Sequence, residues 1–505
     1  MSPLPRLLAA GAFALLLAAT PVRAQERNVP CTAGFAGSYP CLNVDLLAHI
    51  ALPELLTHTA AEVWGWTDPQ TSREYALLGL GNGTAFVDVT LPTAPVYLGK
   101  LPTATTGPGF QWRSVRTYGN YMFVGSEIAG HGVQVFDLTR LRGLTAPPAS
   151  SWTADARYTG AGKSHTLGLN EATGFIYLAG ANEAGFQCSG GGLHIVDVRN
   201  PLTPVFAGCY DGDGYTHENQ CIVYHGPDTT YNDREICIAY NEDTVTAVDV
   251  TNKSAPTLIS RGMYPSVGYT HQGWFTEDRR YLFVDDELDE LNGLATTART
   301  IVMDASDLDN LGYVGSFLSG VPSSDHNQYV RGNYLYQSNY QAGLRILRID
   351  NPAAASVTEV GRFDTYLEGN QVSASSGQWM NYPYFASGIV VASDINNGLF
   401  VLRPTAGTVA GESGPLPASG FRLDSPVPNP TTGTTRLSLT VGEAQAVRAE
   451  AFDALGRRVA VVLGGTVPAG TTDLVFDGSA LPAGVYVVRV VGETFTTAAR
   501  VSVAR

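Results

Sequence analysis

Short runs of alternating apolar and polar residues recur along most of the chain and share one form. A period of two with many β-branched residues predicts half-buried β-strands, and helical periodicity is nearly absent. Seven such runs occur, at residues 83–89 (GTAFVDV), 132–138 (GVQVFDL), 192–198 (GLHIVDV), 244–250 (TVTAVDV), 299–305, 343–349 and 398–402. The pattern therefore predicts seven related β units.

Each run belongs to a larger unit. A second strand pattern precedes it, as at residues 75–80 and 175–179, and an outer apolar stretch follows six of the runs, as at residues 95–101 and 204–210. Self-similarity near fifty residues with several strands per unit is typical of a β-propeller, in which four-stranded blades surround a channel. We predict an all-β fold, a seven-bladed β-propeller followed by a small C-terminal β-sandwich.

The seventh unit lacks its outer strand. Residues 43–52, ahead of the first unit, have the missing pattern. Pairing them with the last blade would remove the open strand edge that an incomplete ring exposes. We therefore expect residues 43–52 to close the last blade, and we place the propeller at residues 43–403.

The chain changes character after the propeller. Residues 404–424 are rich in Gly, Pro, Ser and Thr, as linkers are. Beyond them, short alternating strands between turn residues predict the small β-sandwich, which we place at residues 425–505.

The N-terminus predicts export. Arg6, the apolar run at residues 7–20 and the small residue Ala24 before Gln25 form a signal peptide, which we assign to residues 1–24. The run is too short to span a bilayer, so we expect no transmembrane segment in the mature chain. Residues 25–42 then form an N-terminal segment ahead of the propeller.

Six cysteines lie in the exported part, an even number that suits an oxidising compartment. Sequence alone does not fix their connectivity, and buried free thiols are the alternative to disulfides. No two of them share the spacing of zinc ligands. The pairs that we expect are Cys31 with Cys41, Cys188 with Cys209, and Cys221 with Cys237.

Charge limits the partners. The 505 residues carry a formal net charge of −15, and no basic patch occurs in the sequence. Nucleic acids and anionic membrane surfaces are bound chiefly through Lys and Arg. We therefore exclude nucleic acid as a partner and keep an extracellular protein, peptide or glycan as the candidate ligand.

Four of the nine histidines recur in register, 52, 54 and 55 residues apart, and each directly follows Ser, Thr or Asp. Alignment of the blades puts them at the start of the innermost strand, which faces the central channel near one mouth. Glu62, Arg113 and Met380 take the same position in other blades. The candidate ligand-binding residues at this mouth are Glu62, Trp112, Arg113, His165, His217, His271, His326 and Trp379.

Three roles remain open for the histidines. Hydrogen bonds within each blade would make them purely structural. A polar ligand site is the second role, and Arg113 beside the imidazoles would favour an anionic ligand over a metal. The third is a divalent metal, the one candidate cofactor, because neutral imidazoles bind Zn, Cu, Ni or Fe. The candidate metal residues are His165, His217, His271 and His326 with Glu127, Glu242 and Asp286.

Three C-terminal motifs resemble a known domain. They are Pro428-Asn429-Pro430 with Gly433, then residues 451–459 (AFDALGRRV), then residues 481–486 (LPAGVY). In this order they closely resemble the C-terminal sorting domain of the type IX secretion system of Bacteroidetes-like bacteria. The resemblance implies the type IX secretion machinery as a partner, and the cell surface or the medium as destination. An ordinary carbohydrate-binding sandwich is the alternative.

The propeller also carries motifs that resemble a family. They are residues 112–115 (WRSV), 131–138, 215–217 (YTH), 269–274 (YTHQGW), 285–290 (DDELDE) and 325–327 (DHN). These look like the choice-of-anchor B family, whose strands are similar to LVIVD repeats. The resemblance spans residues 43–402. It implies a shared exported domain joined to a surface anchor and no particular activity.

Two functions from different classes follow. The first is a surface-anchored propeller that acts as a ligand- or protein-binding module through a channel mouth lined by His, Arg and Glu. The alternative is a metal-dependent extracellular enzyme, a hydrolase or lyase that uses the histidine cluster. No Ser-His-Asp order, nucleophile elbow or phosphate loop is recognisable in the sequence, so catalytic residues stay unassigned.

Overall fold

The computed structural model describes residues 27–405, 421–423, 426 and 431–504, apart from 442, 454–456, 469 and 494. The expected signal peptide, the motif Pro428-Asn429-Pro430 and most of the expected linker lie outside these residues. Helical turns in the described chain are the short 3-10 segments η1 (Leu138–Leu141), η2 (Thr229–Tyr231) and η3 (Pro352–Ala354). No helix in this part of the chain is long and apolar enough to cross a membrane.

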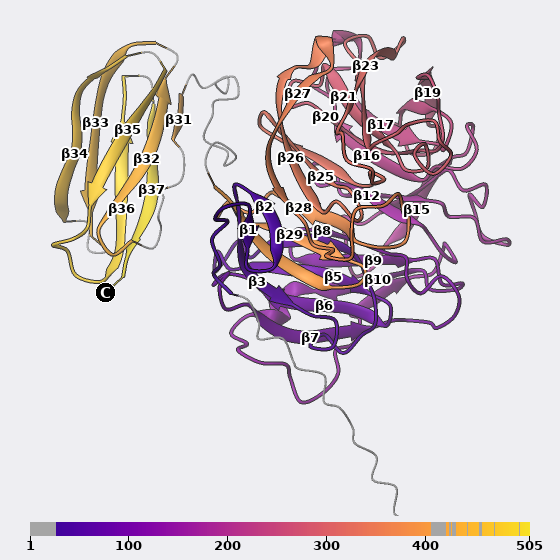
Figure 1. The fold of residues 1–505 in the computed structure, drawn as a ribbon, viewed down its shortest axis with the longest axis horizontal. Coiled ribbons are helices and arrows are strands. Elements are labelled where there is room, and N and C mark those ends of the chain that lie inside the picture. The colour runs from indigo at the N-terminus through magenta and orange to yellow at the C-terminus, as the bar shows by residue number, and fades with distance from the viewer. Residues whose placement is uncertain are drawn as a thin grey trace, which may run out of the picture.

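Seven antiparallel sheets form the blades of a β-propeller (Figure 1). Blades one to three are β4 (Ala60–Thr67), β5 (Glu74–Leu80), β6 (Gly83–Asp88) and β7 (Val96–Pro102); β8 (Arg113–Tyr118), β9 (Tyr121–Ser126), β10 (Val133–Asp137) and β11 (Ala156–Tyr158); and β12 (Thr166–Asn170), β13 (Phe175–Ala179), β14 (Leu193–Asp197) and β15 (Val205–Tyr210).

Blades four to seven continue the pattern. They are β16 (Glu218–Val223), β17 (Glu235–Tyr240), β18 (Val245–Asp249) and β19 (Thr257–Gly262); β20 (Thr270–Phe275), β21 (Tyr281–Asp286), β22 (Arg299–Asp304) and β23 (Gly312–Leu318); β24 (Gln328–Arg331), β25 (Tyr334–Ser338), β26 (Leu344–Asn351) and β27 (Ser356–Phe363); and β28 (Gln378–Tyr382), β29 (Val390–Asp394) and β30 (Gly398–Pro404) with β3 (Val44–Ile50).

The N-terminal strand β3 closes the last blade. It pairs antiparallel with β30, from Val44 opposite Pro404 to Ile50 opposite Leu399. Because an early segment pairs with a late one, the ring has no free edge at this junction. The short strands β1 (Phe35–Ala36) and β2 (Tyr39–Leu42) extend blade six instead, where β2 pairs with β27.

The first strand of each blade lies beside the first strand of the next, and β28 returns to β4, so these seven strands line the channel. Small residues permit the close approach. A Cβ on Gly65 in β4 would lie 2.1 Å from the Tyr382 ring in β28, and one on Gly168 in β12 would lie 1.7 Å from Asn219 Oδ1 in β16.

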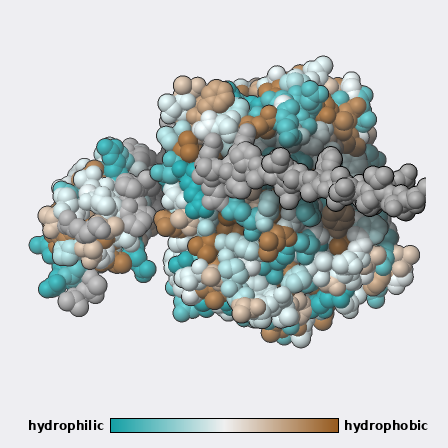
Figure 2. Space-filling view, turned by 60° about the horizontal axis from the view of Figure 1, so that its bottom comes forward, coloured by the Kyte–Doolittle hydropathy of each residue, from teal (hydrophilic) through white to brown (hydrophobic). Residues whose placement is uncertain are grey.

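Apolar side chains on both faces of the middle strands fill the space between blades. All seven residues of β5 are buried, as are all six of β17. Burial of apolar area is the main favourable term in folding. On the face shown in Figure 2, hydrophobic residues are scattered among hydrophilic ones, as on most soluble surfaces.

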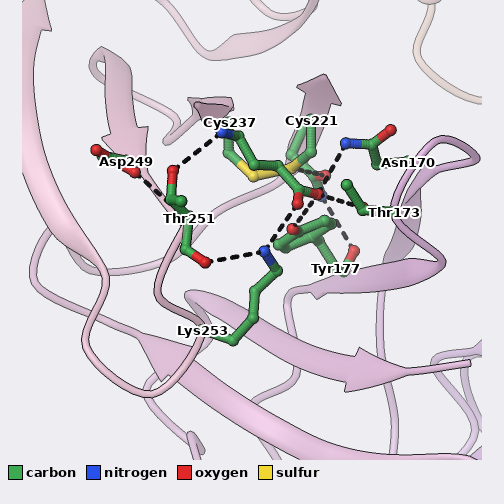
Figure 3. The surroundings of a disulfide bond; sticks show 10 residues. Asn170, Thr173, Tyr177, Cys221, Cys237, Asp249, Thr251 and Lys253 are labelled. Atoms are coloured by element: carbon green, nitrogen blue, oxygen red, sulfur yellow. Dashed lines mark hydrogen bonds and ion pairs between the residues drawn. A yellow bond between two sulfur atoms is a disulfide. The ribbon is translucent and has the colours of Figure 1, made fainter. Parts of the chain in front are cut away.

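Three disulfides link the chain at Cys31–Cys41, Cys188–Cys209 and Cys221–Cys237, the pairs expected from the sequence. The last joins β16 to β17. Beside it, the carboxylate of Glu235 accepts hydrogen bonds from Asn170, Tyr177 and Lys253, which joins blades three and four (Figure 3).

The C-terminal domain is a sandwich of two sheets, drawn in yellow in Figure 1. One sheet holds β31 (Phe421–Leu423), β32 (Thr434–Val441) and β35 (Gly470–Asp477). The other holds β34 (Arg458–Val467), β33 (Gln445–Phe452), β36 (Gly484–Val491) and β37 (Thr496–Val503). Leu437 and Phe476 from the first sheet share one core with Val447 and Val488 from the second.

Candidate ligand site at the channel mouth

The inner strands place the four repeated histidines at their starts. His165 and His217 come directly before β12 and β16, and their backbone N–H groups donate to carbonyls of the second strand in the same blade, at 2.9 and 2.8 Å. His271 lies within β20, where the pairing with β21 shifts by one residue between Thr270 and Gln272. Because the four histidines take the same position in successive blades, their side chains lie at a similar height and distance from the channel axis.

Five rings from five consecutive blades form a stack, which we call the ring stack: His165, His217, His271, His326 and Trp379. Neighbouring ring centroids lie 4.0, 4.4, 4.3 and 4.3 Å apart, with interplanar angles of 45 to 49°. Each imidazole is at most 9% exposed. The stack therefore lies at the mouth with little of each histidine in contact with solvent.

The last position of the stack is occupied by Trp379, whereas the aligned sequences put Met380 there. The pairing of β28 with β29 shifts between Gln378 and Met380. Trp379 is the extra residue of this bulge, so its ring faces His326. Met380 is fully buried in the hydrophobic core instead.

Hydrogen bonds orient three of the four imidazoles, and only one bond stays within a blade. His271 Nδ1 lies 2.7 Å from Asp285 Oδ1 in its own blade. His165 Nδ1 lies 2.6 Å from Glu127 Oε1 of the preceding blade, and His326 Nδ1 lies 2.7 Å from the carbonyl oxygen of Trp379 in the next. His217 Nδ1 has no hydrogen-bond partner among the described residues.

Burial determines the protonation state of most of the four imidazoles. It lowers the pKa of His217 and of His271 well below the usual value, and it lowers the pKa of His326 to about 3. Burial also opposes protonation of His165, but the hydrogen bond and charge of Glu127 outweigh it and raise the pKa of His165. Three imidazoles are thus neutral near pH 7, which leaves ring nitrogens free to accept.

Neighbouring carboxylates in the acidic run at residues 285–290 point in opposite directions. Asp286, an expected metal residue, is engaged by Tyr269 N–H, by Gly268 N–H at 2.8 Å and by Tyr264 O–H at 3.0 Å. Asp285 and Glu287 take the opposite face, as alternation along a strand dictates, and both face His271. The sequence could have indicated this difference, because alternate residues of an extended chain point to the same side, which groups Asp285 with Glu287 and separates Asp286 from both.

Glu242, another expected metal residue, is exposed and accepts a hydrogen bond from Tyr269 O–H at 3.0 Å. Glu287 lies closer to the histidines: its Oε2 is 3.9 Å from His271 Nε2, and Tyr340 O–H donates to its other oxygen. One atom each of His217, His271 and Glu287 lies within 4.8 Å of the other two.

Arg113 points away from the ring stack. Its Nε donates to the carbonyl oxygen of Leu80 at 2.9 Å, and its two terminal nitrogens contact His131 at 3.1 Å and Thr103 at 3.0 Å. The guanidinium thus lies between blades one and two, where burial lowers its pKa to about 10. Arg113, the cation that we expected beside the imidazoles, therefore joins blades one and two instead.

Arg116 supplies the cation inside the channel, and sequence reasoning missed it. Its Nη1 donates to Glu62 Oε2 at 2.7 Å, and its guanidinium lies 4.4 Å from the centre of the Trp64 ring. Ser114 Oγ donates to the same oxygen of Glu62 at 2.9 Å. Glu62 is thus held deeper in the channel than the ring stack.

A small cavity of about 10 Å³ lies beneath the mouth. Most of the expected ligand-binding residues line it, together with two residues that the sequence did not indicate, Thr166 and Glu218. Its lining is Glu62, Trp112, Arg113, His165, Thr166, Glu218, His271, His326 and Trp379. Glu218 directly follows His217, and burial together with the charge of Glu62 raises its pKa to about 7.

Glu218 also borders a second cavity of about 160 Å³. This cavity lies further along the inner strands, because its lining residues Trp64, Arg116 and Trp274 follow the mouth residues in their strands. Glu62 lines the smaller cavity, Arg116 lines the larger one, and Glu218 lines both.

Comparison with known proteins identifies both parts of the chain. Residues 427–504 match the secretion system C-terminal sorting domain. Residues 188–212, 236–263 and 327–365 match the LVIVD repeat, and these stretches fall in blades three, four and six. No curated protein matches the chain in sequence.

Two solved structures give weak matches to this chain. PorZ, a surface component of the type IX secretion system of Porphyromonas gingivalis, is 13% identical with a TM-score of 0.42, and the match covers 86% of this chain and 58% of PorZ. A protein from Lactobacillus plantarum is 14% identical with a TM-score of 0.41, over 82% of this chain and 98% of that protein.

The sorting domain indicates where the protein is located. It implies export, handling by the type IX secretion machinery and localisation at the cell surface. The protein is thus a surface β-propeller with LVIVD repeats and a separate sorting domain.

Proposed function

We propose that this surface propeller is a ligand-binding module that takes an extracellular protein, peptide or glycan at the mouth formed by the ring stack. One observation carries the proposal. Rings from five consecutive blades converge at one mouth, and the buried His217 Nδ1 among them has no partner in the described part of the chain. A buried polar atom without a partner costs about 1–3 kcal/mol, so a ligand group that reaches this nitrogen would gain from a hydrogen bond to it.

The rim supports the same proposal. Trp112, Tyr215, Tyr269 and Trp379 are partly exposed around the buried imidazoles, and Tyr269 meets His217 edge-on at 5.2 Å. Rigid aromatic side chains give contact area at low entropic cost. The half-buried carboxylates of Glu127 and Glu287 add hydrogen-bond acceptors for hydroxyl or amide groups of a ligand.

Array binding tests this function. The mature chain would be probed against a peptide array and a glycan array, beside Tyr269→Ala at the mouth and Tyr313→Ala on the outer strand β23. Tyr313 is 39% exposed and is the matched control. We expect ligands of one class to bind, with affinity lowered about tenfold or more by Tyr269→Ala, since rim aromatics often dominate binding.

Tyr313→Ala should bind as the parent does. The proposal is overturned if neither array gives a ligand, or if every ligand binds both tyrosine variants equally, because the binding surface would then lie elsewhere.

A further inference from the structure

We infer that His217, His271 and Glu287 form a site for a transition-metal ion of the zinc class. One ligand atom of each lies within 4.8 Å of the other two, and the three come from blades four and five at the channel mouth. The inference rests on the proposed function for its location, because the ion would lie where the ligand is proposed to enter.

The donor atoms select the class of metal. Two imidazole nitrogens with one carboxylate suit zinc and its neighbours, whereas calcium and magnesium take oxygen ligands. Tetrahedral bonds of about 2.1 Å place ligand atoms about 3.4 Å apart. His271 Nε2 and Glu287 Oε2 are 3.9 Å apart, so a small side-chain rotation brings them to bonding geometry.

Second contacts orient two of the three ligands. Asp285 Oδ1 lies 2.7 Å from His271 Nδ1, which leaves Nε2 to face Glu287. Tyr340 O–H donates to Oε1 of Glu287, while Oε2 faces the histidine. A carboxylate behind a ligating histidine and a hydrogen bond on a ligating carboxylate are typical of metal sites, because they fix the direction of the ligand atom.

The third ligand lacks a partner. His217 is 6% exposed, and its Nδ1 is unpaired among the residues that the structure describes. One nitrogen of its ring lies within 4.8 Å of one nitrogen of His271. Coordination would give this imidazole the partner that it lacks.

Two buried carboxyl groups in this part of the mouth have oxygens without partners among the described residues. Asp285 and Asp325 are each 1% exposed, and Asp285 Oδ2 and both oxygens of Asp325 have no hydrogen-bond partner within the described ranges. The nearby Arg299 is engaged by Asp289 at 2.6 Å. Polar atoms without partners in the protein interior are costly, and a divalent ion at the mouth would give these oxygens a favourable contact.

Three protein ligands leave one position of a tetrahedral ion open. Because the site faces the mouth, this position would take an oxygen donor from the extracellular ligand. A carboxylate is an oxygen donor that zinc accepts, so we expect the extracellular ligand to carry one.

Zinc titration of the mature chain tests the inference. After EDTA dialysis, calorimetric titration with ZnCl₂ should give one bound equivalent, and titration with CaCl₂ should give none at this site. Glu287→Gln keeps the size of the side chain and an acceptor for Tyr340, and it should weaken zinc binding about tenfold or more. His217→Asn should do the same, and it serves if Glu287→Gln melts abnormally.

Two controls address adventitious surface sites. His225 is an exposed histidine, and Asp309 is an exposed member of an acidic group that also holds Asp307 and the partly buried Asp228. His225→Ala and Asp309→Asn should bind zinc as the parent does. The inference is overturned if no zinc binds, or if both mouth variants bind zinc as tightly as the parent.

The two proposals fail separately. Array binding that persists in EDTA, together with no zinc bound in the titration, would overturn the metal site and leave the binding function in place. Zinc binding without any array ligand would overturn the binding function and leave the metal site in place.

Discussion

His326 in blade six is joined to Trp379 in blade seven twice: its Nδ1 lies 2.7 Å from the tryptophan carbonyl oxygen, and the two rings lie 4.3 Å apart. The first contact belongs to the backbone of Trp379 and the second to its side chain. A substitution at Trp379 therefore removes the ring contact and keeps the hydrogen bond. The end of the ring stack can thus be tested without disturbing the imidazole orientation.

Trp379→Ala should lower the free energy of unfolding by about 1–3 kcal/mol, because a partly buried aromatic ring and its contacts with His326 are lost. Trp379→Phe should cost less, since a ring remains. The propeller transition in urea, followed by circular dichroism, measures both. Equal stability of Trp379→Ala and the parent would show that the stack does not contribute to folding.

Glu235 joins blades three and four by polar contacts. Glu235→Ala should destabilise the propeller by about 3 kcal/mol or more, because the partly buried Lys253 ammonium, 2.8 Å from the carboxylate, and two buried hydrogen-bond donors of blade three lose their partner. Asp350→Ala breaks a more exposed pair with Arg348 and should change stability by about 0.5 kcal/mol or less. Similar losses in both variants would contradict the special role of Glu235.

The ion pair of Asp68 and Arg142 makes part of the stability depend on pH. Hydrogen bonds from Arg142, at 2.7 and 2.9 Å, lower the pKa of Asp68 from 3.8 to about 2. A carboxyl with a lowered folded pKa stabilises the fold above the unfolded pKa, and this stability is lost as pH falls through the folded pKa.

Asp68→Asn should therefore be less stable than the parent at pH 7, by about 1 kcal/mol after allowance for screening of the partly exposed Arg142. The difference should shrink between about pH 4 and pH 2. Denaturant melts at several pH values measure it. A difference that stays constant down to pH 2 would contradict the lowered pKa.

The repeat made most of the fold predictable from sequence. The alternation in the third strand of each unit, as at Gly83–Asp88 in β6, indicated seven blades, and the spacing of His165 and His217 located the channel mouth. Strand periodicity and repeat length are local properties, so a single sequence carries them.

The side-chain directions at the mouth were less predictable. A one-residue bulge placed Trp379 where the alignment put Met380, and a bulge leaves no mark in the apolar pattern. The long side chain of Arg113 reaches His131 instead of the channel, since its flexible stem permits either direction. Glu218 was missed because a single charged residue at the start of a strand gives no sign in the sequence of the residues that it contacts.

Removal of the sorting domain should separate export from folding. A chain ending at Leu423 should fold, because the propeller and the sandwich have separate hydrophobic cores, yet it should stay in the periplasm. Fractionation and protease accessibility of intact cells measure this, with the full chain as the surface-exposed control. A truncated chain at the cell surface would contradict the role of the domain in sorting.

Hydrogen exchange of the mature chain with its strongest array ligand tests the binding function most directly. We predict added protection at the starts of the inner strands, around His165, His217, His271, His326 and Trp379, and no change in the outer strands β7, β19 and β23. Protection confined to the outer strands or to the recess at Trp64 and Trp274, with none around the ring stack, would contradict ligand binding at this mouth.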